Sequence, residues 1–231
     1  MKKTLIVFSL VLVLAIFSTS LVSAELPGTN WWSALFMQNI GSSNDTVKLM
    51  AYDKTTGVFG DGTPHPFDFG QSLAYDPGKS TGGAYIDFGE DLPPGFEGSV
   101  VLSSGAPMAA ISEIANYPNG DLGISGGTAA ARYQGISDTD IATDLMVPTI
   151  KHNYVGHTTT LYVQAADADA NVTVTFNMND GSTHSQSTTI SANRMFVFDP
   201  AAATPPVAST NCGFNANTSP CYGSAEINST N

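Results

Sequence analysis

The chain has 231 residues, of which 42% are hydrophobic and only 12% are charged, so the composition suits a packed globular protein and argues against a disordered one. The 20 acidic residues outnumber the 8 basic ones, which gives a net charge of −12 at pH 7. A surface this acidic repels nucleic acid and anionic lipid headgroups, because binding either of them requires basic side chains near phosphates.

The first 24 residues have the order of a secretory signal peptide. Lys2 and Lys3 precede the apolar run 5–17, and residues 22–24 (VSA) end in the small side chain that a signal peptidase accepts. The apolar run is too short to cross about 30 Å of hydrocarbon as a helix; a longer, uncleaved anchor is the alternative. No cysteine lies near the cleavage site, which excludes a lipoprotein anchor. We expect export to the cell surface or the medium, with cleavage after Ala24 and a net charge of −14 on the mature chain.

Strand-like alternation then runs through most of the mature chain. In residues 46–52, Val47, Leu49 and Ala51 share one face, and turn-forming clusters follow such runs. The best helical candidates, 128–133 and 138–146, are short and could equally be irregular. Many short strands with Gly- and Pro-rich turns predict an all-β fold of the sandwich type. The other β-rich runs are 98–104, 158–164 and 172–177.

An internal repeat organises these strands. Residues 32–38 line up with 158–164 at a shift of 126 positions, and residues 98–104 line up with 223–229 at a shift of 125. The repeat predicts two tandem β-sandwich domains, because each unit contains its own succession of strands. We place the first domain at 25–138, including a Gly-rich boundary segment, and the second at 139–231.

Several motifs carry a resemblance to a known kind of protein. The chain is similar to the repeat of secreted bacterial and archaeal surface proteins, which carry tandem immunoglobulin-like sandwiches. The resemblance implies a modular secreted or cell-surface protein and offers no catalytic residues to transfer. The second unit departs from the pattern, because residues 165–167 (AAD) replace the Asn-Ile-Gly turn. The motifs are 31–32 (WW), 38–41 (QNIG), 98–104 (GSVVLSS), 107–111 (PMAAI), 131–135 (ARYQG), 145–148 (LMVP) and 162–164 (YVQ).

The second domain is expected to be incomplete. In the first unit, residues 98–104 are followed by 105–114, whose apolar residues indicate another strand of the same sandwich. By the shift of 125, the counterpart of that run would occupy positions 230–239, whereas the sequence given ends at Asn231. We therefore expect the native product to continue with further modules or a surface anchor. The alternative is an imperfect repeat whose second domain closes with fewer strands.

Two motifs suggest chemistry but have plainer interpretations. Residues 123–127 (GISGG) satisfy G-x-S-x-G, yet a turn precedes them where a nucleophile elbow needs a buried strand, so we interpret them as a loop and predict no enzyme. Asp167 and Asp169 begin like a calcium loop, but Val172 and Met178 stand where an EF-hand needs Gly and Glu. A looser calcium site at the two aspartates is a weak alternative to a solvated turn, and no cofactor is predicted.

Other polar and aromatic residues give weaker signals. The four histidines, at positions 65, 152, 157 and 184, show no metal-ligand spacing and are taken as surface residues. Trp31 and Trp32 are adjacent, so on a strand one ring would face outward, where it could contact a ligand or pack on a neighbouring domain. Sequons, which license glycosylation of exported chains, occur at Asn44, Asn171, Asn217 and Asn228.

The only two cysteines, Cys212 and Cys221, are predicted to form a disulfide, because export places them in an oxidising compartment. Free thiols or metal ligation are the alternatives, although two cysteines without a suitable histidine pair make a poor zinc site. These observations together predict an exported protein with a structural or adhesive role at the cell surface. The competing prediction is a carbohydrate- or other ligand-binding module of a larger secreted protein. Partners would be surface proteins or glycans, and membrane contact would come only through the export signal or an anchor outside this chain.

Overall fold

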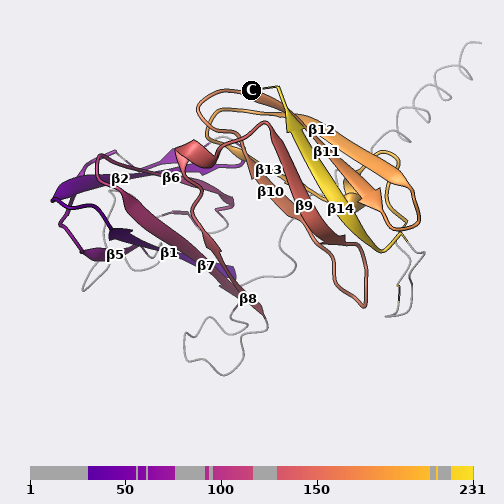
Figure 1. The fold of residues 1–231 in the computed structure, drawn as a ribbon, viewed down its shortest axis with the longest axis horizontal. Helices are drawn as coiled ribbons and strands as arrows, with labels where there is room; N and C mark the ends of the chain where they lie inside the picture. The colour runs from indigo at the N-terminus through magenta and orange to yellow at the C-terminus, as the bar shows by residue number, and fades with distance from the viewer. Residues whose placement is uncertain are drawn as a thin grey trace, which may run out of the picture.

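The protein is all-β in the computed structural model, which describes residues 31–55, 57–60, 62–75, 92–93, 96–116, 129–208, 212 and 220–230 (Figure 1). Two short 3-10 turns, Asp138–Asp140 and Pro200–Ala202, are the described helical elements. The strands fall into a first group, β1–β8, and a second group, β9–β14, as the colours of Figure 1 show.

The first group forms two antiparallel sheets around one core. One sheet has the order β5-β1-β7-β8, and the other has the order β3-β2-β4, with β6 also beside β2. Val47, Leu49 and Ala51 are buried on β2, as the alternation of the sequence predicted, and they pack with Met37 and Phe67. The strands are β1 (Trp31–Asn39), β2 (Asp45–Asp53), β3 (Val58–Phe59), β4 (His65–Phe67), β5 (Ser72–Tyr75), β6 (Gly98–Ser104), β7 (Met108–Asn116) and β8 (Ala129–Gln134).

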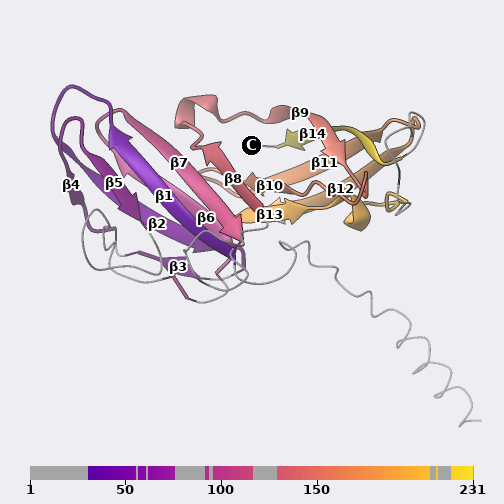
Figure 2. The same ribbon diagram turned by 90° about the horizontal axis from the view of Figure 1, so that it is seen from below.

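The second group has its own core between a four-stranded sheet, β12-β11-β14-β9, and the pair β10-β13 (Figure 2). Alternation along β11 turns Val172, Val174 and Phe176 inward, where they are buried. Both groups are therefore β-sandwich-like. The strands are β9 (Asp144–Lys151), β10 (Leu161–Gln164), β11 (Ala170–Met178), β12 (Thr183–Ile190), β13 (Met195–Phe198) and β14 (Tyr222–Ser229).

The central ladders of the two groups have the same register. In the first group, Asp53 of β2 pairs with Gly98 of β6, and Val47 pairs with Ser104. Residue numbers 125 higher than Asp53 and Gly98 give Met178 and Gly223, which pair in the same way in β11 and β14. The hydrogen bond that extends each ladder by one pair is repeated as well. It runs from Lys54 N–H to the Glu97 carbonyl in the first group and from Asn179 N–H to the Tyr222 carbonyl in the second. The two groups thus repeat one arrangement of backbone pairs and not only a loose sequence pattern.

The two groups touch at the turn that precedes β13. Ser99 Oγ donates a hydrogen bond to the Asn193 carbonyl, and Arg194 Nη1 donates to the carbonyl of Asp53. Both contacts join a loop of the second group to the first group, where β2 ends and β6 begins. None of the helices in the described ranges is long and apolar enough to cross a membrane.

Both helical candidates of the sequence are wrong. Residues 129–134 form β8, which pairs with β7 from Ile111↔Gln134 to Asn116↔Ala129. Residues 138–140 make only one 3-10 turn, and β9 begins at Asp144 because it pairs with β14. Ladder pairing supplied by distant strands therefore outweighs local propensity at both places.

Candidate functional site

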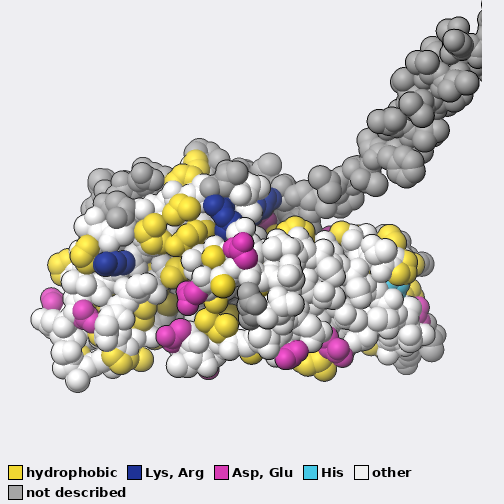
Figure 3. All heavy atoms as spheres, turned by 90° about the horizontal axis from the view of Figure 1, so that it is seen from above, with side chains coloured by type: hydrophobic (Ala, Val, Ile, Leu, Met, Phe, Trp, Pro, Cys, Tyr) yellow, Lys and Arg dark blue, Asp and Glu magenta, His cyan; other side chains and the backbone are white. Residues whose placement is uncertain are grey.

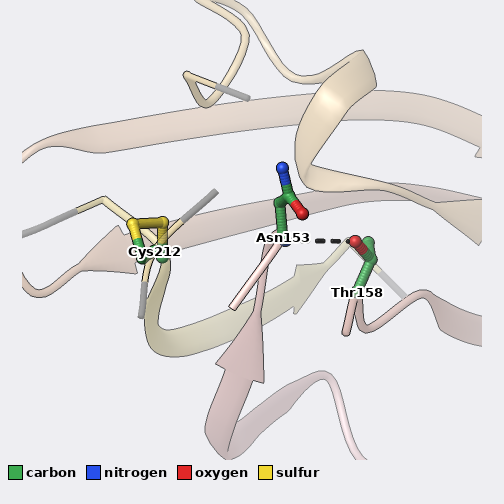
Figure 4. The surroundings of a disulfide bond; sticks show 4 residues. Asn153, Thr158 and Cys212 are labelled. Carbon is green, nitrogen blue, oxygen red and sulfur yellow. Dashed lines mark hydrogen bonds between the residues drawn. A yellow bond between two sulfur atoms is a disulfide. The ribbon is translucent and has the colours of Figure 1, made fainter. Parts of the chain in front are cut away.

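The disulfide closes one end of the second group. Cys212 and Cys221 lie at disulfide distance, with 6.0 Å between their Cα atoms, and form the bond that the sequence predicted (Figure 4). The Cys221 carbonyl accepts from His152 N–H at 2.8 Å, and the Cys212 carbonyl accepts from Val155 N–H at 2.8 Å. The disulfide thus fastens the turn at residues 152–158, which we call the stapled turn, to β14.

The backbone of the stapled turn is strained. Asn153, Val155 and Gly156 have φ values of 53°, 53° and 77°. Left-handed backbone suits glycine and is tolerated by asparagine, whereas the branched Cβ of valine makes it costly. Such a conformation persists only where neighbours over-determine it. Here the neighbours are the Cys212 backbone and Thr158, whose Oγ1 accepts from Asn153 N–H at 3.1 Å (Figure 4).

Aromatic contacts fix one side of the stapled turn and leave its tip open. The Tyr154 ring meets Tyr222 edge to face, with 5.5 Å between centroids, and Lys151 Nζ lies 5.8 Å from the Tyr154 centroid. Gly156, His157 and Thr158 are exposed. A rigid, strained turn with an exposed tip is the kind of feature that binding loops on rigid scaffolds share, which makes it the candidate site for contact with a partner.

A hydrogen-bonded chain runs through His184 near the same end. Its Nδ1 donates to the Pro205 carbonyl at 2.8 Å, and its Nε2 lies 2.8 Å from Ser182 Oγ. Ser182 Oγ also donates to Asp180 Oδ1 at 2.6 Å. A serine beside an imidazole can be a nucleophile, but here the carboxylate contacts the serine and not the imidazole, unlike the arrangement of a triad. We interpret the chain as a brace for the turn between β11 and β12.

His152 is buried without hydrogen bonds from its ring. His152 is only 4% exposed, and neither Nδ1 nor Nε2 of its ring has a hydrogen-bond partner. Burial lowers the pKa of His152 below its usual 6.5. The negative charge of Asp199 raises this pKa by a smaller amount, and the nearby His184 lowers it further. Folding therefore favours the neutral ring, and the unfolded chain binds more protons than the folded one just below pH 6.5.

Stability is therefore expected to fall as the pH drops through 6.5 toward the lowered pKa of His152. In His152→Leu this fall should disappear, and the free energy of unfolding at pH 7 should change little, because no hydrogen bond is lost. Urea unfolding of both proteins at pH 7 and pH 5 measures the difference. His157→Leu is the matched control at an exposed histidine. An unchanged pH dependence in His152→Leu would contradict the assignment to His152.

The disulfide should also stabilise the second group measurably. Replacing both cysteines with serine is expected to lower its free energy of unfolding by roughly 2–3 kcal/mol, the chain-entropy value for so short a loop. Urea unfolding gives the difference, and the wild type in reductant should match the variant. Mass spectrometry after alkylation without reduction provides the direct check; two alkylated thiols in the folded wild type would refute the bond.

The other residues singled out in the sequence lie apart from the stapled turn. Trp31 and Trp32 begin β1, opposite Asn116 and Ala115 of β7, and their side chains lie outside the described residues. Asp167 and Asp169 are exposed, and Asp169 Oδ1 accepts from Ala192 N–H at 2.9 Å, which links two loops. Within the described residues, no three His, Cys, Asp or Glu side chains gather in a way that could hold a metal ion.

Three of the four sequons lie in the described part. Asn44, Asn171 and Asn228 are exposed, and each side chain takes part in a hydrogen bond; Asn44 Oδ1 accepts from Phe69 N–H at 2.9 Å. Asn228 Nδ2 donates to Asp144 Oδ1 at 2.7 Å, and Asn171 Oδ1 accepts from Thr189 Oγ1 at 2.7 Å. The fourth sequon, at Asn217, and the G-x-S-x-G segment 123–127 lie outside the described residues.

The sequence interpretation of the histidines is wrong for two of the four. His152 and His184 are buried, at 4% and 8% exposure, whereas His157 is exposed and His65 half-buried. His184 faces inward because it pairs with the buried Phe176 of β11, and the polar neighbours Thr183 and Ser185 gave no sign of this in the sequence. No local signal could have revealed the stapled turn, because the distant disulfide segment holds it.

Comparisons with known proteins do not identify this chain. No protein-family model matches it, and neither a curated protein nor a solved structure does.

Proposed function

We propose that this is an exported protein of the cell surface, with a structural or adhesive role, built from two tandem immunoglobulin-like domains. The repeated register of β2–β6 and β11–β14 carries the proposal, because it gives two similar, self-contained sandwich-like units in series. Tandem β-sandwiches serve as spacers and adhesive modules in many cell-surface proteins. The stapled turn would be the point of contact in an adhesive role.

Export is supported by the residues that precede the described part and by the cysteine pair. The charged start, apolar run and small residues of 1–24 have the order of a cleaved signal peptide. A disulfide is compatible with the oxidising conditions outside the cytoplasm. The face drawn in Figure 3 shows few Lys and Arg side chains, and the chain has only 8 of them against 20 Asp and Glu, which suits solubility outside the cell.

The competing proposal is a carbohydrate- or other ligand-binding module. A sugar-binding face would need a row of outward aromatic rings across one sheet. In the described residues, the exposed large aromatics are Phe36 on β1, Phe69 in a turn and Tyr162 on β10, which belong to different elements. This scatter favours the structural or adhesive role.

Export predicts a defined mature terminus. Amino-terminal sequencing of the protein recovered outside the producing cells should begin Glu25-Leu26-Pro27. The Ala24→Arg variant should block cleavage, since the peptidase requires a small residue there. Recovery of the wild type with Met1 retained in the membrane would show that the segment is an anchor.

The surface role is tested on intact cells of the producing organism. Antibody raised against residues 25–231 should label unpermeabilised cells or the medium, and cells that lack the protein should lose cohesion or attachment. Complementation with His157→Ala, altered only at the exposed tip of the stapled turn, should reduce attachment if that turn makes the contact. Saturable binding of the mature protein on a glycan array would favour the ligand-binding alternative.

A further inference from the structure

The three described sequons differ in the kind of backbone that carries them. Asn44 lies in the turn between β1 and β2, where its neighbours Ser42 and Ser43 are exposed as well. Asn171 lies on β11, between β12 and β14, and Asn228 lies on β14, between β11 and β9. A transferase that adds a glycan to asparagine takes the sequon as a surface loop. Among the described sequons, only that of Asn44 begins in one.

The side chain of Asn44 is held through its oxygen, which leaves its nitrogen free. Asn44 Oδ1 accepts from Phe69 N–H at 2.9 Å, and this bond fixes the orientation of the amide because only the oxygen can accept. The sugar is added to Nδ2, and the transferase also reads the hydroxyl of the third sequon residue, which is the exposed Thr46. Within the described part of the chain, neither Asn44 Nδ2 nor Thr46 Oγ1 makes a hydrogen bond.

The sequon at Asn228 has both of these atoms engaged. Asn228 Nδ2 donates to Asp144 Oδ1 at 2.7 Å, and a hydrogen bond to a carboxylate is among the stronger ones. The hydroxyl of this sequon, Thr230 Oγ1, accepts from Asn171 N–H at 3.3 Å. The backbone between them pairs with β11 on one side and with β9 on the other. A transferase would have to break these bonds before it could add a sugar.

The sequon at Asn171 is held in a similar way. Asn171 Oδ1 accepts from Thr189 Oγ1 at 2.7 Å, and the hydroxyl of this sequon, Thr173 Oγ1, lies 2.9 Å from Ser187 Oγ. Both bonds join β11 to β12, and β11 also pairs with β14 on its other side. The fold therefore holds the sequons of the second group flat in a sheet and presents the sequon of the first group on a turn.

An exposed aromatic residue also lies beside Asn44. Phe69, whose N–H donates to Asn44 Oδ1, is 63% exposed. Aromatic rings pack on the apolar faces of sugars, and shielding an exposed ring from water is favourable. A glycan attached to Asn44 would begin within reach of this ring, so the site also offers a contact for the first sugar.

We propose that Asn44 carries an N-linked glycan in the mature protein and that the fold leaves Asn171 and Asn228 unmodified. The donor is an oligosaccharide joined through its anomeric carbon to a lipid phosphate. Asn44 Nδ2 forms a bond to that carbon, and the bond between the carbon and the phosphate oxygen breaks. The lipid phosphate leaves with the bonding electrons, and a base of the transferase takes the amide proton. The inference rests on the export proposed above, because sequons are modified on exported chains.

Peptide mapping by mass spectrometry, on protein recovered outside the producing cells, locates the glycan. We expect it on the peptide that contains Asn44, and Asn44→Gln or Thr46→Ala should abolish it there. Thr46→Ser keeps the hydroxyl and should keep the glycan. Exported protein that begins at Glu25 but has an unmodified Asn44 would overturn this inference and leave export intact, and so would a glycan found only on Asn217.

Transfer in vitro separates the effect of the fold from that of the sequon. A purified oligosaccharyltransferase and a lipid-linked oligosaccharide are incubated with the folded, unmodified mature protein, and separately with peptides of each sequon. All the peptides should be modified. In the folded protein, transfer to Asn44 should be roughly tenfold or more faster than to Asn228, whose amide must first leave its carboxylate partner. Equal rates at the two sites of the folded protein, or no transfer to Asn44, would overturn the proposal. The peptides are 42–48 (SSNDTVK), 169–175 (DANVTVT) and 225–231 (AEINSTN).

Discussion

Replacing Phe176 with alanine should lower the free energy of unfolding of the second strand group by about 3–5 kcal/mol and leave the first group unchanged. Phe176 is fully buried among Val172, Val174 and Phe198, so the truncation loses apolar burial and leaves a cavity. Phe67, which is equally buried, occupies the core of the first group. Phe67→Ala should therefore weaken the first group and spare the second.

Denaturant unfolding of the mature protein, followed by amide exchange at each group, measures both effects. Phe69→Ala is the matched control, because Phe69 is 63% exposed and should change stability by less than about 0.5 kcal/mol. If either core substitution shifted a single shared transition by the same amount, the two groups would be one cooperative unit and the tandem-domain proposal would be wrong.

Adding one methyl group at Gly223 should destabilise the second group by about 3 kcal/mol, at the upper end for overpacking. A Cβ at Gly223 would lie 2.1 Å from the Asn177 carbonyl oxygen, on the strand paired with β14. Gly98 repeats this approach in the first group, where its Cβ would lie 2.1 Å from the Tyr52 carbonyl oxygen. Backbone atoms cannot rotate away as a side chain can, so the ladder itself would have to open.

Gly98→Ala and Gly223→Ala, each measured by urea unfolding, should each lower the stability of their own group. Ser224→Ala on the same strand is the control, since it adds no atom. A Gly223→Ala protein as stable as Ser224→Ala would show that β11 and β14 do not approach as closely as described.

The faces of the central strands could be predicted from sequence because their periodicity is undisturbed. Val47, Leu49 and Ala51 alternate with polar residues and are buried, as are Val172, Val174 and Phe176. The segment 138–146 could not be predicted, because its acidic and apolar residues fit a helical turn as well as a strand. Pairing with β14, distant in sequence, decides between them.

The candidate site was predictable only in part. The disulfide could be predicted because the chain has only two cysteines and is expected to be exported. The strained turn that the disulfide segment holds could not be predicted from residues 152–158 themselves. Valine disfavours a positive φ because its Cβ is branched. Val155 adopts one because its N–H is held by a hydrogen bond to the Cys212 carbonyl. His152 N–H donates to the Cys221 carbonyl, so the backbone of this histidine is also held by a segment that is distant in sequence.

The equal register of the two groups creates a competition during folding. Backbone pairing alone would let β6 join β11, or β14 join β2, because both ladders have the same offset. The side chains differ, however: the pair Lys48 and Ser103 on one ladder corresponds to Thr173 and Asn228 on the other. Divergence between the two copies thus discriminates against exchanged strands, while the glycine that permits close approach stays the same in both.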